Sequence, residues 1–170
     1  QRKQSIQTAM DHKTAFLLIC GGYQLFGQYY KDQDGNVIEG LKFFDYYTVA
    51  GNRDERCIGN IAVETTMDGK TFKAVGFENH GGQTKNVSTP FAKVLSGHGN
   101  EMHSGYEGFM NDQVLATYMH GPLLPKNPDI ADAILKRALK KRYGEVTLEP
   151  LDDTIEYQAQ NVMLERLQCK

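Results

Sequence analysis

The residues with the most chemical potential in this sequence are a cysteine and a histidine, each placed at the end of an apolar run. Cys20 closes the run over residues 15–19, and His120 closes the run over residues 114–119. A cysteine becomes an effective nucleophile when a nearby base accepts its proton. The two residues therefore predict covalent chemistry at a carbonyl carbon, with Cys20 as the nucleophile and His120 as the base.

The residues after Cys20 favour a sharp turn that exposes the sulfur. Two glycines follow directly, and the segment after them is amphipathic, so we expect a nucleophile elbow between a strand and a helix, with the glycines removing clashes of side-chain carbon atoms. The free N–H groups at the start of that helix would lower the pKa of the thiol. The backbone N–H of Gly21 could also stabilise an oxyanion.

Plainer interpretations stay open at both residues. Cys20 could be a packed strand residue, since free cysteines are among the most buried residue types, and His120 could simply end a strand with its ring bonded to the backbone. Three further histidines are expected at the surface, because His12 lies in a polar segment and His98 and His103 lie in a glycine-rich loop.

Composition excludes several classes of function. The formal net charge is -2, so nothing suggests nucleic acid or an anionic membrane as a partner. No apolar run approaches the roughly 20 residues that span a bilayer, and no signal peptide is visible. No metal site is predicted, because the sequence lacks CxxC, HExxH and any carboxylate cluster at ligand spacing. The three cysteines are odd in number and widely spaced, which predicts a reducing, cytoplasmic setting.

The pattern of apolar residues predicts one α/β domain over residues 1–170. Two short apolar strands lie side by side and parallel, so that their carboxyl ends bring Cys20 and His120 to one edge of the sheet. The first of them should be buried on both faces. The expected elements are helices at 1–13, 23–31, 128–142 and 154–167, strands at 15–19 and 114–119, and a hairpin over 59–79 that turns at residues 68 and 69.

Three motifs then indicate a family. CGGYQ at residues 20–24 resembles the CxGxQ nucleophile elbow of the class I glutamine amidotransferases. ENHG at residues 78–81 is similar to the glutamine-binding loop of that class, and YMHGP at residues 118–122 is similar to its histidine strand. Most of the class has a glutamate two residues after the histidine, whereas this sequence has Pro122.

The missing glutamate resembles the cobyric acid synthase-like branch of the class. Within that branch, the runs CGGYQLFG, GFENHGGQT and HGPLLPKNPDI are similar to the glutaminase subunits of lipid II isoglutaminyl synthases. This resemblance implies a flavodoxin-like, open and mainly parallel sheet with flanking helices and an antiparallel hairpin. It also implies that the sequence starts after an N-terminal part that carries a Gly-rich oxyanion loop.

The resemblance further implies how the site binds its substrate, L-glutamine. Gly21 would be an oxyanion donor, and Arg56 would grip the substrate carboxylate, with Arg53 as a rival for that role. A surface arginine remains the plainer interpretation of either one. Cys57, the neighbour of Arg56, is expected to be structural. The positions that would hold glutamine are Gln24, Asn79, Gly81 and Gly82.

The resemblance places the remaining chemistry in a partner. A Mur-ligase-like synthetase subunit would form a heterodimer with this chain, bind ATP and magnesium, supply the acid that orients His120, and amidate D-glutamate of lipid II in peptidoglycan synthesis. This chain itself would need no cofactor. Two alternatives stay open: the glutaminase domain of another amidotransferase, such as one of corrinoid biosynthesis, and a catalytically inactive scaffold subunit.

Overall fold

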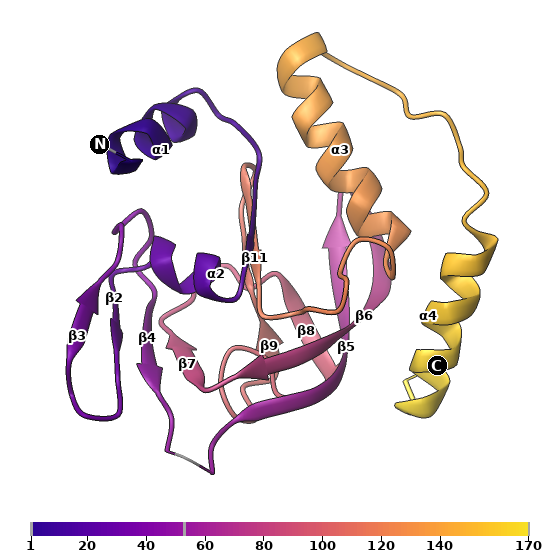
Figure 1. The fold of residues 1–170 in the computed structure, drawn as a ribbon. Coiled ribbons are helices and arrows are strands. Elements are labelled where there is room, and N and C mark those ends of the chain that lie inside the picture. Colours follow the sequence, from indigo (N-terminus) through magenta and orange to yellow (C-terminus); the bar gives the residue numbers. More distant parts are fainter. Residues whose placement is uncertain (1, 53, 170) are drawn as a thin grey trace.

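The chain folds as an α/β domain in which helices flank three small sheets (Figure 1). This computed structural model describes residues 2–52 and 54–169. The α/β class predicted from the sequence is thus confirmed. Among the described residues the helices are α1 (Arg2–Asp11), α2 (Gly21–Phe26), α3 (Pro128–Tyr143) and α4 (Thr154–Arg166). The strands are β1 (Phe16–Ile19), β2 (Tyr29–Lys31), β3 (Val37–Glu39), β4 (Tyr47–Ala50), β5 (Cys57–Met67), β6 (Lys70–His80), β7 (Gly82–Lys85), β8 (Ala92–Ser96), β9 (Tyr106–Glu107), β10 (Phe109–Met110) and β11 (Val114–Thr117).

The two strands expected side by side are indeed adjacent and parallel. Strand β1 pairs with β11, with Ile19 opposite Thr117, and β10 continues this sheet in the antiparallel direction. Strands β2 and β4 are also parallel, while the other strand pairs of the described residues are antiparallel. Because β1 forms an edge of its sheet, Leu18 is its one buried residue, so the prediction of burial on both faces was wrong.

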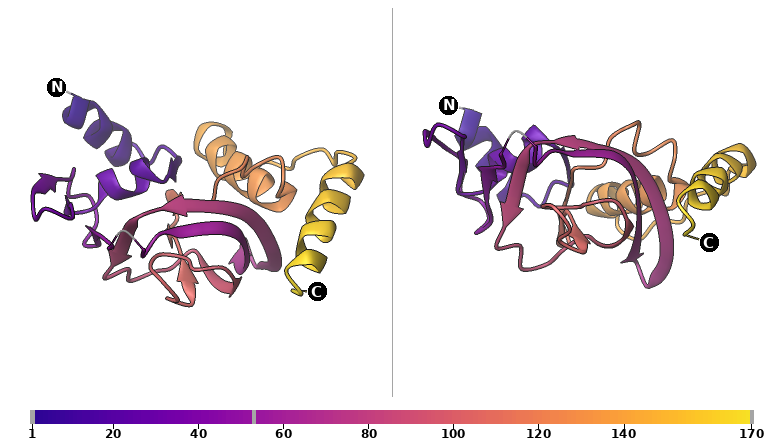
Figure 2. Two further views of the ribbon diagram at one scale, coloured as in Figure 1. Left: turned by 60° about the horizontal axis from the view of Figure 1, so that its bottom comes forward. Right: turned by 90° about the horizontal axis from the view of Figure 1, so that it is seen from below.

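The longest feature is the predicted hairpin, formed by β5 and β6. Asp68 and Gly69 form its two-residue turn with φ angles of 51° and 79°, as a tight hairpin of this twist requires. The register then runs without a break from Met67 opposite Lys70 to Cys57 opposite His80. Both strands of the hairpin are strongly curved, as the views in Figures 1 and 2 show.

The segment after Cys20 differs from the prediction of a helix over 23–31. Helix α2 starts at Gly21 and ends at Phe26, and the chain continues as strand β2 beside β4. The reason is a close backbone approach at Gly27, where a Cβ atom would lie 2.6 Å from the carbonyl oxygen of Tyr46. The next N–H, that of Gln28, donates to the same oxygen at 2.8 Å.

Two apolar clusters meet at β11 and fill the centre. The first packs side chains of the β5–β6 hairpin against β11 and helix α3, with Ile61, Leu115 and Ile130 fully or almost fully buried. The second is rich in aromatic rings and packs α2 against the other side, around Tyr23 and Tyr118. Burial of this apolar surface is the main favourable term that holds the sheets together.

The side chain of Asn127 joins the hairpin to both C-terminal helices. Its Nδ2 donates to the carbonyl oxygens of Val75 and Leu123 at 2.8 and 2.7 Å. Its Oδ1 accepts from the N–H of Val75 at 2.8 Å and from Nε2 of Gln160 at 3.0 Å. Helix α4 therefore docks against β6 (Figure 1) partly through one fully buried amide.

We expect Asn127→Ala to destabilise the fold strongly, by about 2–4 kcal/mol, because it leaves several buried polar groups without partners. Urea unfolding monitored by circular dichroism measures this change. Gln160→Ala removes one of the four contacts and should cost clearly less. Equal losses in the two variants would contradict a central role for Asn127.

Candidate functional site

Cys20 forms the turn between β1 and α2 and carries the backbone strain of that turn. Its φ and ψ angles are 50° and -106°, a conformation that costs a residue with a side chain on the order of 1–3 kcal/mol. Two hydrogen bonds hold it: its N–H donates to Thr117 O at 2.9 Å, and its carbonyl accepts from the N–H of Gln24 at 3.0 Å. Such strain at the end of a strand is the geometry of a nucleophile elbow.

The two glycines after Cys20 do not serve the purpose expected of them. A Cβ atom at Gly21 would meet nothing within 4 Å among the described residues, and one at Gly22 would make an ordinary contact of 3.8 Å with Leu18. The expectation that they relieve clashes was therefore wrong, because the strained backbone is that of Cys20 itself. Gly21 instead begins α2 and is exposed, with its N–H beside the sulfur.

The pKa of the Cys20 thiol is raised rather than lowered. Partial burial of the sulfur raises the pKa, and the backbone N–H of Gly21 offsets this increase only in part. The expectation of a lowered pKa overestimated the effect of a helix of six residues. At neutral pH the residue is thus a thiol, and its use as a nucleophile requires a base.

His120 lies three residues beyond β11, on the side of the sheet where β1 ends. Its backbone forms a bridge with Phe77 of β6 through two hydrogen bonds of 2.7 and 3.1 Å. Its ring atom Nε2 is buried and has no partner in the structure. Within the described part of the chain no hydrogen bond joins this ring to the Cys20 sulfur. The structure thus brings the two strand ends together without joining the two side chains.

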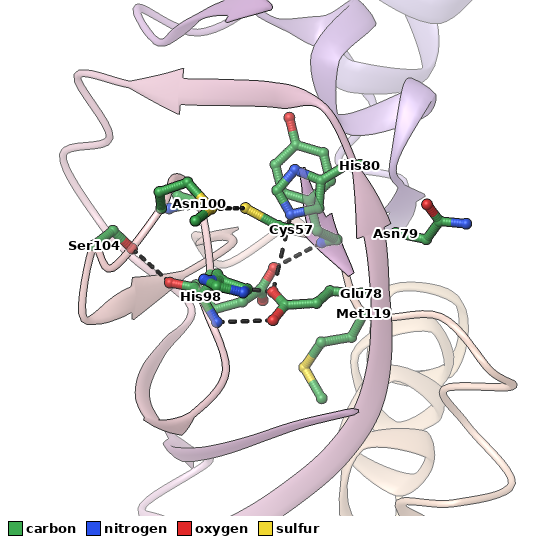
Figure 3. Close-up of polar contacts among 12 residues, drawn as sticks. Cys57, Glu78, Asn79, His80, His98, Asn100, Ser104 and Met119 are labelled. Carbon is green, nitrogen blue, oxygen red and sulfur yellow. Dashed lines mark hydrogen bonds and ion pairs between the residues drawn. The ribbon is translucent and has the colours of Figure 1, made fainter. Parts of the chain in front are cut away.

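The end of β6 sends alternate side chains to opposite faces. Glu78 and His80 point into the protein, whereas Asn79 points out on the other side of the strand (Figure 3). There the Oδ1 atom of Asn79 accepts a hydrogen bond from Nη2 of Arg56 at 3.0 Å. Gly81 lies against the same guanidinium, since its added Cβ would be 3.3 Å from Nη1. Arg53, the rival candidate, lies outside the described residues.

Two hollows meet beside these residues. Arg56 and Gly81 line the first, of about 450 Å³, which we call the Arg56 hollow. Gly21 and Gln24 line the second, of about 330 Å³, which we call the Gln24 hollow. Tyr30 belongs to the walls of both, so the hollows adjoin at its side chain. Sequence reasoning did not single out Tyr30, which was expected inside a helix.

Gly82 explains how Gln24 reaches the Gln24 hollow. A Cβ atom at Gly82 would come within 2.6 Å of Gln24 Nε2 and of the Thr48 side chain. The amide of Gln24 therefore packs directly on the backbone of β7, which a larger residue would prevent. The predicted glutamine-binding residues thus form two groups, one around Arg56 and one around Gln24.

A buried polar cluster backs the site from inside. The carboxylate of Glu78 accepts hydrogen bonds from the backbone N–H groups of His98 and Gly99 at 2.7 and 3.0 Å (Figure 3). The ring of His80 stacks on Tyr118 with centroids 3.7 Å apart, and burial lowers its pKa to about 4. His98 therefore belongs to this cluster through its backbone and does not fit the surface role expected for it.

The side chain of Glu107 fixes the end of β11, and nothing in the sequence predicted this role. Its carboxyl group is fully buried and accepts hydrogen bonds from Thr117 Oγ1 and from the N–H of Tyr118, each at 2.7 Å. Burial raises its pKa to about 7. A lone glutamate between a tyrosine and a glycine gives no pattern from which such burial could be inferred.

Within residues 2–52 and 54–169, no group of three or more His, Cys, Asp or Glu side chains is placed to bind a metal ion. The helices in the same ranges are too short or too polar to cross a lipid bilayer. The features of the site are its cysteine, its histidine, the two hollows and the buried cluster behind them.

Comparison with known proteins defines the class to which this site belongs. Residues 1–128 match the CobB/CobQ-like glutamine amidotransferase domain, and the chain belongs to that family. It is 36% identical over 164 residues to subunit GatD of lipid II isoglutaminyl synthase (glutamine-hydrolyzing) from Staphylococcus aureus (strain N315), which covers 96% of this chain and 65% of that protein.

Two other relatives extend the comparison. The GatD subunit of Streptococcus pneumoniae (strain ATCC BAA-255 / R6) is 37% identical over 146 residues, covering 85% of this chain and 55% of that protein. A probable cobyric acid synthase of Methanocaldococcus jannaschii is 31% identical over 158 residues, covering 85% of this chain and 31% of that protein. The chain thus spans less than two thirds of the length of each of these relatives.

We expect Glu107→Gln to change how stability depends on pH. The raised pKa means that the folded state holds this proton more tightly than the unfolded state, where the pKa is near 4.5. Its contribution to stability is therefore present below pH 4.5 and is lost as the pH rises through about 7. Relative to the variant, the wild type should lose roughly 2–3 kcal/mol between these values.

Urea unfolding at several pH values between 4.5 and 8 measures the difference between the two proteins. Glu145→Gln, which changes an exposed carboxylate, is the matched control and should keep the pH dependence of the wild type. The assignment fails if Glu107→Gln and the wild type show parallel curves.

Proposed function

We propose that this chain is the glutamine-hydrolysing part of a lipid II isoglutaminyl synthase. The observation that carries the proposal is the strained turn at Cys20, which ends β1 beside the strand that leads to His120. A backbone angle this unfavourable persists where the surrounding structure enforces it, and such residues cluster at active sites. Membership of the glutamine amidotransferase family and similarity to two GatD subunits support the same chemistry.

The proposed reaction proceeds through a thioester. His120 takes the proton of the Cys20 thiol, and the sulfur attacks the side-chain carboxamide carbon of L-glutamine. His120 returns the proton to the departing nitrogen, so that ammonia leaves and a γ-glutamyl thioester remains. His120 then takes a proton from water, which attacks the thioester and releases glutamate and the thiol. The raised pKa of Cys20 makes the base necessary in the first step.

The residues that line the two hollows would make the contacts with the substrate. The N–H of Gly21 supplies one donor to the tetrahedral oxyanion, because it lies beside the sulfur. Arg56, held by Asn79, would bind the α-carboxylate of glutamine through its planar guanidinium. Gln24 and the backbone around Gly81 and Gly82 would enclose the rest of the substrate.

The second half of the proposed reaction belongs to a partner. Ammonia would pass to a Mur-ligase-like synthetase subunit, which binds ATP and magnesium and amidates D-glutamate of lipid II in the cytoplasm. A catalytic imidazole needs a group that fixes its orientation, and that subunit would supply the acid that orients His120. This chain would need no cofactor of its own.

A corrinoid amidotransferase is the second candidate, because the chain also resembles a probable cobyric acid synthase at 31% identity. It would share the glutaminase chemistry and differ in the synthetase. An inactive scaffold subunit would keep the fold without the reactivity of Cys20. Ammonia release and the choice of synthetase partner separate the three.

We expect the full-length protein to release ammonia from L-glutamine weakly alone and more strongly with the Mur-ligase-like subunit. Cys20→Ala should lower the rate about 10³-fold or more, because it removes the nucleophile. A coupled glutamate dehydrogenase assay measures the rates. Equal rates with and without the partner would contradict a borrowed acid.

A labelling experiment decides the case in which no ammonia is released. Iodoacetamide should alkylate Cys20 before Cys57 and Cys169. Cys57 is fully buried and has a pKa raised to about 11 by burial. Absence of both ammonia release and preferential labelling in a folded complex would favour the scaffold. Stimulation by a corrinoid synthetase alone would favour the second candidate.

We expect Arg56→Ala to raise KM for L-glutamine about 10- to 100-fold with a smaller effect on kcat, since a hydrogen bond to a charged group contributes about 1.5–3 kcal/mol. Steady-state kinetics measure both constants. Arg142→Ala, on α3, is the control and should leave KM unchanged. An unchanged KM in Arg56→Ala would assign this arginine to the surface.

A further inference from the structure

A line of buried hydrogen bonds joins the nucleophile helix to the strand that leads to the histidine. Nε2 of Gln24, on α2, donates to the hydroxyl of Tyr118 at 3.1 Å. That hydroxyl lies 2.6 Å from Thr84 Oγ1, which lies 2.8 Å from Thr48 Oγ1. The tyrosine and both threonines are buried, so water does not compete for the bonds among these three hydroxyls.

The ring of Tyr118 is held as firmly as its hydroxyl. One face stacks on His80, with centroids 3.7 Å apart and an angle of 8° between the planes. Tyr23 packs against the ring at 5.2 Å, and the backbone N–H of Tyr118 donates to Glu107. The hydroxyl therefore offers Gln24 an acceptor at a fixed position.

Because Nε2 of Gln24 is held in place, the position of the amide oxygen, Oε1, is fixed as well. Because Nε2 contacts the Tyr118 hydroxyl and lies against the backbone of Gly82, Oε1 occupies the opposite side of the amide group. Across residues 2–52 and 54–169 no hydrogen bond reaches that oxygen, and Gln24 lines the hollow that adjoins Tyr30. The amide thus presents an acceptor to a ligand.

The acceptor Oε1 of Gln24 and the positively charged guanidinium of Arg56 belong to the two hollows that adjoin at Tyr30. The Arg56 hollow offers a guanidinium, which binds a carboxylate, while the Gln24 hollow offers Oε1. The Glu39 carboxylate also lines the Gln24 hollow, where it pairs with Lys42 at 3.2 Å. An amino acid whose α-carbon lay beside Tyr30 would direct its carboxylate into the Arg56 hollow and its ammonium into the Gln24 hollow.

We propose that Tyr118 is a positioning residue that sets the specificity for the α-amino group of the substrate. It acts through Gln24, whose Oε1 it turns toward the ammonium of the bound amino acid. The inference rests on the proposed function and adds to it the residue that makes the site read an amino acid rather than any primary amide.

The test compares Tyr118→Phe with Tyr46→Phe in the full-length protein with its synthetase partner. Tyr46 is a matched control, because its buried hydroxyl donates to Tyr23 O in the same aromatic cluster without touching Gln24. Two substrates are used: L-glutamine and its analogue without the α-amino group, glutaramate. Loss of one hydrogen bond of about 0.5–1.5 kcal/mol predicts a change of about 3- to 10-fold.

We expect Tyr118→Phe to raise KM for L-glutamine by that factor with little change in kcat, and to leave KM for glutaramate nearly unchanged. The preference of the wild type for L-glutamine would shrink accordingly, while Tyr46→Phe keeps it. A merely structural role would move both substrates together. An unshifted preference in folded Tyr118→Phe would overturn the inference, although hydrolysis itself would continue to support the proposed function.

A second readout does not depend on turnover. The side-chain amide protons of Gln24, followed by NMR, should exchange with water faster in Tyr118→Phe than in the wild type and in Tyr46→Phe. Equal exchange in all three proteins would overturn the inference even if the proposed function failed. Faster exchange together with absence of glutamine hydrolysis would support the positioning of the Gln24 amide by Tyr118 and refute the proposed function.

Discussion

The parallel pairing of β1 with β11 is the constraint on which the rest of the site depends. Four residue pairs set its register, and the N–H of Cys20 extends the ladder by one bond to Thr117. That bond holds the first residue after β1 in its strained conformation, next to the strand that continues to His120. Two further contacts support this turn. Glu107 binds the end of β11, and the aromatic rings of α2 pack into the second apolar cluster. Strain at one residue is thus sustained by the burial of many others.

The substrate side of the site depends on a different principle, the alternation of side chains along β6. Asn79 faces outward and orients Arg56, while Glu78 and His80 face inward and order the loop and the ring behind the site. The same short run therefore supplies a binding residue and its internal support. Because these roles lie on opposite faces of one strand, they are fixed together by a single register.

Sequence reasoning located the chemistry better than its surroundings. Local patterns were sufficient for the hairpin, the helices α1, α3 and α4, and the adjacency of β1 and β11, because each has a clear period or turn signal. They failed where a distant contact decides: the helix after Cys20 ends early because Gly27 meets Tyr46. Burial of Glu107 and the raised pKa of Cys20 were also beyond reach, since both depend on which segments cover a residue. Tyr118 stood in a recognised motif, yet the hydrogen-bond partners of its hydroxyl come from α2 and β7.

The two-residue turn of the β5–β6 hairpin limits how this chain can change in length. Adding one residue to β6 between the turn and Asn79 would reverse the faces beyond it, turning His80 outward and Asn79 into the interior. The stretch over residues 144–153, before α4, has no such role and lies outside any strand pairing. Insertions and deletions should therefore be tolerated in that connection but should disrupt the site when they fall in the hairpin strands. The length of the hairpin strands thus fixes which side chains face the site.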